Sequence, residues 1–120
     1  MTSEFIQAVM TKLNTIVTTY FEEAPNDANM PYAVLQNASI RGEDNYEPII
    51  LDIVLYQEDT PTLDVETYTN SIKAGLDKAI VSSAGKFSSH IYFESSDNVR
   101  DTDTDLISRR LTFTARVFYL

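Results

Sequence analysis

The feature that most constrains the fold of this chain is a period-two pattern of apolar residues in two segments. In residues 49–56 every second residue is a branched aliphatic one: Ile49, Leu51, Ile53 and Leu55. From about Leu106 to the C-terminus, one face collects the apolar residues Ile107, Leu111, Phe113, Ala115, Val117 and Tyr119. Arg109 interrupts this face near its start, where a side chain can still reach water. Because successive side chains of a strand point to opposite faces, both segments are predicted to be strands with one buried face.

Two other segments carry apolar residues at helical spacing. The first is predicted to begin near Thr2 or Ser3 and to be ended by Pro25, with the apolar stripe Phe5, Ile6, Val9, Met10, Leu13, Ile16, Val17 and Tyr20. The second begins at Asp64 as its cap and carries Val65, Tyr68, Ile72, Leu76, Ala79 and Ile80. Gly75 inside this helix costs about 1 kcal/mol relative to alanine, so we expect a close packing contact there.

The remaining elements are two further strands and the connections between them. The strands are predicted at residues 31–40 and 87–94, the first of them as an edge strand after Pro31. The connections are assigned to residues 41–45, 57–61, 82–86 (with Gly85 as the turn residue) and 95–105. The order helix–strand–strand–helix–strand–strand predicts a single α+β domain over residues 1–120. Its four-stranded antiparallel sheet should carry two helices packed on one face.

The composition narrows the classes of function. A chain of 120 residues with 43% hydrophobic content is large enough for one core. It has no cysteine, which removes disulfides, zinc–thiolate sites and thiol nucleophiles. Its net charge is −9, from 18 acidic and 9 basic residues, and such a surface repels both phosphate backbones and anionic membranes. No signal peptide and no apolar stretch of about 18 residues is present, so we expect a soluble protein that folds inside the cell.

The acidic segment 97–105 is the strongest candidate for metal chemistry. Asp101, Asp103 and Asp105 alternate as the first ligands of a calcium loop do. That loop also needs a glycine at its sixth position and a glutamate at its twelfth, and Leu106 and Thr112 stand there instead. We therefore interpret the segment as a solvated hairpin tip and expect no bound metal.

The residues needed for catalysis are scarce. His90 is the single histidine, and it lies among serines and a tyrosine in a predicted strand. Triad or general acid–base chemistry needs a partnered carboxylate and a substrate pocket as well. Three scattered glycines cannot form a phosphate-binding loop. The sequence therefore predicts neither an enzyme nor a bound cofactor.

Two features of the last strand admit two readings each. Arg110 and Arg116 share its polar face, where they can pair with an acid such as Glu94 of the neighbouring strand or with a carboxylate of another subunit. Phe118 places an aromatic ring on this otherwise polar face. Either the first helix or a neighbouring subunit is expected to cover that ring.

With this layout assembled, the chain resembles the tail terminator, or tail completion, family of long-tailed bacteriophages. The local features are Ala24 and Pro25 closing the first helix and the segment Pro31–Leu35 opening the first strand. The strand at residues 49–56, the acidic helix around residues 68–80 and the alternating C-terminal strand support it.

The resemblance implies a structural protein that closes the tail tube as a ring, usually sixfold, and joins it to the head-completion or stopper proteins. Its partners would be other copies of itself, the tail tube protein and that stopper. DNA would pass through the lumen without being read. Its place would be the head-proximal end of the virion tail, after assembly in the host cytoplasm. This family has no ligand signature, so no site residue is carried over from it.

The acids expected to line the lumen or the axial docking loops are Glu43, Asp44, Asp97, Asp101, Asp103 and Asp105. The residues expected at the subunit interface are Tyr32, Val34, Arg110, Arg116 and Phe118. Because sheet edges can pair across subunits, the strand at 31–40 or the C-terminal strand is expected to be such an edge.

Three other readings fit the same sequence. One is a different head–tail connector or neck component, which only the partner would separate from a terminator. Another is an acidic DNA-mimic inhibitor, which would place carboxylates where a DNA-binding enzyme expects phosphates. The last is a small metal-dependent hydrolase built on the acidic loop.

Overall fold

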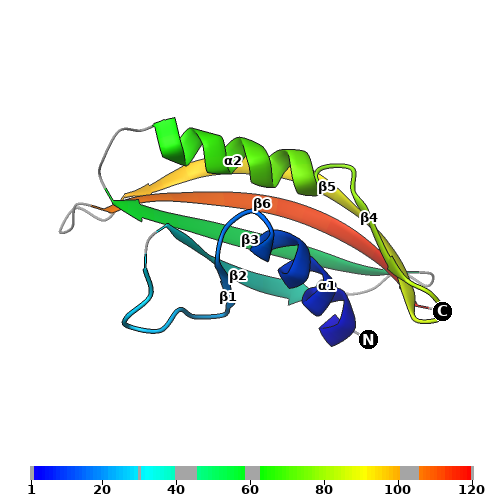
Figure 1. Ribbon diagram of the computed structural model, residues 1–120. Coiled ribbons are helices and arrows are strands. Elements are labelled where there is room, and N and C mark those ends of the chain that lie inside the picture. Colours follow the sequence, from blue (N-terminus) through cyan, green and yellow to red (C-terminus); the bar gives the residue numbers. More distant parts are fainter. Residues whose placement is uncertain (1, 30, 40–45, 59–62, 101–105, 120) are drawn as a thin grey trace.

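The computed structural model describes residues 2–29, 31–39, 46–58, 63–100 and 106–119. Two helices and six strands follow each other along the chain (Figure 1). In order these are α1 (Thr2–Asn14), β1 (Thr19–Phe21), β2 (Tyr32–Ser39), β3 (Glu47–Glu58), α2 (Leu63–Leu76), β4 (Ile80–Ser83), β5 (Phe87–Arg100) and β6 (Leu106–Tyr119). No helix in the described ranges is long and apolar enough to cross a membrane.

The strands form one mixed sheet in the order β1-β2-β3-β6-β5-β4. β1 is parallel to β2, and every other neighbouring pair is antiparallel. The four predicted strands are present and make up the centre of the sheet. The predicted four-stranded antiparallel sheet is nevertheless wrong, because a short strand is added at each edge.

β1 arises where the sequence pattern predicted the end of the first helix. That helix stops at Asn14, whose side-chain Oδ1 accepts a hydrogen bond from the N–H of Thr19 at 2.9 Å. The next five residues, 15–19, are all β-branched. Such side chains lose rotamer freedom in a helix and fit an extended chain better. The apolar stripe thus continues in space after the helix has ended.

β4 arises in the same way after α2. The helix ends at Leu76, and Lys78 adopts a left-handed backbone conformation with φ 61°. This reverses the chain, so that Ile80, predicted on the helix, becomes the first residue of β4. Gly85 has φ 76° in the turn between β4 and β5, which confirms its assignment as the turn residue.

Two strands are longer than their patterns indicated. β3 runs to Glu58 and therefore takes in the first residues of the predicted connection 57–61. β5 runs to Arg100, so residues 95–100 are strand and not connection. A bulge between Phe93 and Ser95 shifts the register of β5 by one residue, which hid the strand from a search for strict alternation.

The core lies between the sheet and both helices, which cover the same face (Figure 1). The alternating aliphatic residues of β3 and the apolar residues 111–117 of β6 are buried on that face, as predicted. Phe5 of α1 meets Phe87 of β5 edge to face, with ring centres 5.9 Å apart. A β-carbon on Gly75 would lie 3.2 Å from Cδ1 of Ile16, which confirms the expected close packing.

Candidate interaction surface

The face of the sheet that no helix covers carries all five residues predicted at a subunit interface. On each strand these residues alternate with buried core residues, so their side chains point to the other side. They are Tyr32 and Val34 of β2 and Arg110, Arg116 and Phe118 of β6. The structure therefore brings the five residues to one face, and their role in an interface remains a prediction.

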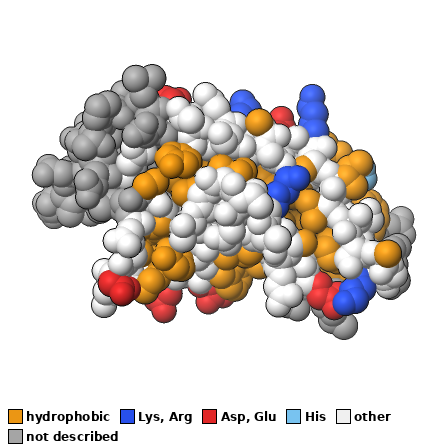
Figure 2. All heavy atoms as spheres, viewed as in Figure 1, with side chains coloured by type: hydrophobic (Ala, Val, Ile, Leu, Met, Phe, Trp, Pro, Cys, Tyr) orange, Lys and Arg blue, Asp and Glu red, His pale blue; other side chains and the backbone are white. Residues whose placement is uncertain are grey.

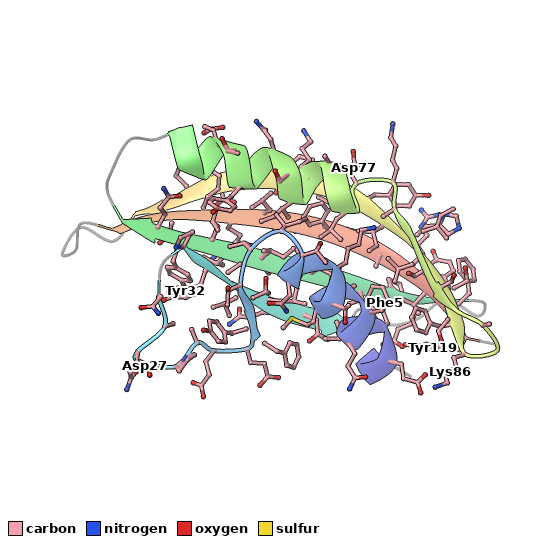
Figure 3. The ribbon with its side chains drawn as sticks, in the orientation of Figure 1. Phe5, Asp27, Tyr32, Asp77, Lys86 and Tyr119 are labelled. Atoms are coloured by element: carbon pink, nitrogen blue, oxygen red, sulfur yellow. The ribbon has the colours of Figure 1, made fainter. Side chains whose placement is uncertain are left out.

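A cluster of three tyrosines, Tyr20, Tyr32 and Tyr56, lies on this face. Figure 3 labels Tyr32 at the start of β2. The ring of Tyr32 stacks on that of Tyr56, its partner in the β2–β3 register, with centres 5.1 Å apart. Tyr20 of β1 meets Tyr32 edge to face at 5.9 Å. Burial raises the pKa of the Tyr32 hydroxyl above its ordinary value of 10.0, and the hydroxyls of Tyr56 and Tyr20 act in the same direction.

Another part of this face carries what we call the aromatic–basic patch, formed by Tyr46, Ile80, His90, Arg116 and Phe118. Phe118 lies 5.5 Å from Tyr46 and 6.5 Å from His90, measured between ring centres. The guanidinium of Arg116 lies 5.6 Å from the centre of the Tyr46 ring, within range of a cation–π contact. Of the two readings of Phe118, coverage by the first helix is wrong, because α1 packs on the opposite face.

Arg110 does not pair with Glu94 as one reading of the sequence expected. Glu94 lies in the bulge of β5, which leaves Asp97 in register with Arg110. Within the described ranges, neither Arg110 nor Arg116 has a carboxylate within 4.0 Å. The paired arginine of β6 is Arg109 on the helix side, which contacts Glu66 of α2 and donates to Oδ1 of Asn98 at 3.0 Å.

Of the predicted lumen or docking acids, Asp97 is exposed on β5. Glu43, Asp44, Asp101, Asp103 and Asp105 lie outside the described residues, so their roles stay predictions. Among the residues that the structure does describe, no group of three or more histidine or acidic side chains is placed to hold a metal ion.

The edges of the sheet differ from the prediction. β2 lies between β1 and β3, and β6 lies between β3 and β5, so neither is an edge. At the edge strand β1, two backbone groups on the outer side are already used. Thr19 N–H donates to Asn14, and the carbonyl of Phe21 accepts from the N–H of Glu23 at 2.8 Å. This edge is therefore partly closed to a further strand.

The edge strand β4 is more open. The carbonyl groups of Ala79 and Val81 turn toward β5, where they accept bonds from Ile91 N–H at 3.0 Å and Ser89 Oγ at 2.7 Å. The backbone groups of Ile80 between them therefore point away from the sheet. Its side chain is 64% exposed, the largest exposure among the bulky apolar residues described. Among the described residues, β4 thus combines an unpaired backbone edge with an exposed apolar residue.

A hollow of about 980 Å³ lies on the helix side between α1 and the β1–β2 edge. Figure 2 shows this side of the molecule, with hydrophobic side chains visible between the helices. The lining residues are Ile6, Gln7, Met10, Thr11, Asn14, Thr15, Phe21 and Asn37. Sequence reasoning missed the hollow, because it exists only where β1 replaces the expected end of the helix.

The comparisons with known proteins bear on this architecture directly. Residues 6–118 match the family described as tail completion protein gp17. The chain belongs to the tail completion protein gp17 family. This match spans nearly the whole domain, and it confirms the resemblance that the sequence layout suggested. No curated protein matches the chain.

Two solved structures share the fold of this tail completion protein. One is a chain in the virion of a native gene transfer agent particle, at 16% sequence identity and a TM-score of 0.65. The alignment covers 92% of the present chain and 84% of the other. The second is 7% identical, with a TM-score of 0.76, and the alignment covers 100% of the present chain and 97% of the other. At these identities the structures establish the fold alone.

Family membership makes the chain a structural component of a phage tail. Proteins of this family are structural and are typically not enzymes. The helix-free face and the sheet edges are accordingly the surfaces on which we expect assembly contacts to form.

Proposed function

We propose that this tail completion protein closes the head-proximal end of the tail tube as a ring of identical copies, six in the usual form. In this role it contacts the tube protein on one side and the head-completion or stopper protein on the other. The family match carries the proposal, because it covers residues 6–118 of the chain.

The surface of the subunit supports assembly into a ring. A ring needs a head-to-tail interface, in which two different patches of the subunit meet. The helix-free face carries exposed arginines and partly exposed aromatic residues. The two edges of the sheet differ in chemistry, since β1 is partly closed and β4 is more open within the described residues. Such an asymmetric pair of edges suits a head-to-tail contact.

The net charge of −9 suits a passage for DNA. An acidic inner wall repels phosphate groups and lets DNA slide, whereas a basic wall would hold it. We assign this wall, or the axial docking loops, to acids among Glu43, Asp44, Asp97, Asp101, Asp103 and Asp105. Replacing Asp101, Asp103 and Asp105 by asparagine should lower the yield of joined, infectious particles, and an unchanged yield would reject this assignment.

The experiment that tests the ring-closing role is electron microscopy of particles assembled without this protein. A terminator stops tube growth, so its loss should give tails longer than normal and without heads. Supplying the wild-type chain should restore normal length and joining. Tails of normal length in the absence of the protein would contradict the proposal.

The same micrographs distinguish a tail terminator from a different neck component, which is the alternative role. Loss of a connector or stopper on the head side should leave tails of normal length beside separate heads. Tail length, and not the absence of joining, is therefore the measurement that decides between the two.

A further inference from the structure

The loop after β1 is an acidic, exposed segment beside an edge of the sheet. Residues 22–29 contain Glu22, Glu23 and Asp27, all exposed, and no basic residue. Figure 3 shows Asp27 far out on this loop, away from the sheet. The loop thus carries three negative charges beyond the β1 edge.

Hydrogen bonds hold the base of this loop in place. Glu22 has φ 69°, a conformation that costs a non-glycine residue roughly 1–2 kcal/mol. Its N–H donates to the carbonyl of Leu35 at 2.9 Å, and its own carbonyl accepts from Nε2 of Gln36 at 3.3 Å. The N–H of Ala28 closes a turn onto the carbonyl of Pro25 at 3.0 Å. The three carboxylates are therefore presented on an ordered backbone.

The aromatic–basic patch has the complementary chemistry. Arg116 is exposed, and within the described ranges it has no carboxylate within 4.0 Å. His90 lies beside it, opposite in the β5–β6 register. The exposed side chain of Ile80 and the ring of Phe118 add apolar surface. The patch therefore suits a partner that brings carboxylates together with short apolar groups.

The acidic loop of one subunit cannot contact the aromatic–basic patch of the same subunit. The loop leaves the sheet at β1, whereas the patch begins at β4, and these strands form opposite edges of the sheet. A neighbouring copy placed beside the β4 edge can bring its own loop to the patch. Such a contact joins two different surfaces and so can repeat around a ring.

We propose that the acidic loop of residues 22–29 docks on the aromatic–basic patch of the next copy of this chain. The proposal rests on the ring function proposed above and names the two surfaces of its subunit contact. Asn14 and Glu23 already bind outer backbone groups of β1. The proposed contact is therefore made by side chains and their charges, and not by strand pairing at β1.

Cross-linking tests this contact. Because the chain has no native cysteine, only the introduced cysteines of this protein can react. Asn26 lies in the loop, and Ser82 lies on β4 beside the patch; both are exposed. The double variant N26C/S82C, assembled into tails and treated with a short bis-maleimide, should give a ladder from dimer up to the full ring. Each single variant should give no cross-link, and a mixture of the two should stop at dimers.

Two results of this experiment would overturn the proposal. Dimers from S82C or N26C alone would mean that like surfaces meet, as in a twofold contact. A double variant that enters particles but cross-links only to the tube or neck proteins would mean that another partner covers these surfaces.

A charge reversal provides the second arm. Arg116→Glu in the N26C/S82C background should lower the ladder yield by about tenfold or more, because like charges then face each other. Adding Glu23→Arg should restore much of it. Lys73→Glu is the matched control, since Lys73 is exposed on α2, on the other face of the sheet from the patch, and it should change the yield little. An unchanged yield for Arg116→Glu, with an unaltered melting temperature, would contradict the proposal.

The tail-length measurement keeps this inference separate from the function on which it rests. Overlong tails without the protein, together with no ladder from the double variant, would reject the contact and keep the ring-closing role. A ladder together with normal tails in the absence of the protein would reject the ring-closing role and keep the contact.

Discussion

The carboxylate of Asp77 accepts a hydrogen bond from the backbone N–H of Phe93 at 2.9 Å. Asp77 directly follows α2 (Figure 3), and Phe93 begins the bulge of β5. The β4 strand pairs with β5 only as far as Ile80 and His90, so the N–H of Phe93 lies beyond its reach. One side chain therefore joins the end of the helix to the irregular point of the sheet.

Replacing Asp77 by alanine should lower the free energy of unfolding by about 1–2 kcal/mol, because a partly buried N–H would lose its partner. Urea unfolding followed by circular dichroism measures the change. Asp77→Asn keeps an acceptor and should recover part of the loss. As a control, Asp27→Ala removes an exposed loop carboxylate and should change stability by less than about 0.5 kcal/mol.

Replacing Lys78 by glycine should stabilise the protein. It has φ 61° just after α2, a conformation that glycine adopts without strain. Lys78→Gly should raise the free energy of unfolding by roughly 0.5–1 kcal/mol. Ser71→Gly, at an exposed position inside α2, should lower it by a similar amount. A loss of stability with Lys78→Gly would show that the turn is not held as described.

Tyr32 should make the protein sensitive to alkali. The pKa of its hydroxyl is raised in the folded state above 10.0, first by burial and then by Tyr56 and Tyr20. The folded protein then keeps a proton that the unfolded chain releases, so stability is complete below about pH 10 and falls above it. The free energy of unfolding of the Tyr32→Phe variant, measured with urea, should fall less between pH 9 and pH 11 than that of the wild type. Tyr92→Phe, at a more exposed tyrosine of the same face, should follow the wild type.

Phe113 and Ile80 should lose very different amounts of stability on truncation. Phe113 is fully buried between the sheet and the helices, and its ring meets Phe93 at 5.5 Å. Phe113→Ala should cost about 3–5 kcal/mol of stability. Ile80→Ala should cost less than about 1 kcal/mol, since its side chain is largely in water already. Equal losses at the two positions would contradict the separation of core and interaction surface.

The sequence pattern predicted the structure correctly where burial of one face determined the residue types over a long segment. Alternation in β3 and in the second half of β6 reports burial on one face only, and both faces were assigned correctly. Helical spacing identified both helices for the same reason. The left-handed turn at Gly85 was predictable because only glycine adopts that conformation without strain.

The pattern failed where a short local interaction decided the outcome. An apolar stripe through Ile16, Val17 and Tyr20 fits either a helix or a strand. The capping of Thr19 by Asn14, together with the β-branched run, selects the strand. The same holds at Lys78, where a left-handed residue ends α2 before Ile80. The bulge at Glu94 could not be read either, since one inserted residue exchanges the two faces of a strand.

The five residues predicted at a subunit interface lie on one face of the sheet, although the sequence selected them on two different grounds. Arg110, Arg116 and Phe118 were placed by alternation, which fixes their face. Tyr32 and Val34 were placed at an expected edge, but β1 occupies that edge, and the two residues reach the helix-free face through their register with β3.

Cryo-electron microscopy of the neck of the assembled particle tests the central claim most directly. The account predicts a closed ring of this chain at the head-proximal end of the tail tube, with the DNA path through its centre. In that ring the helix-free face and the β4 edge should be covered by neighbouring subunits. Density for the chain elsewhere in the particle, or as single copies without contact between them, would contradict the account.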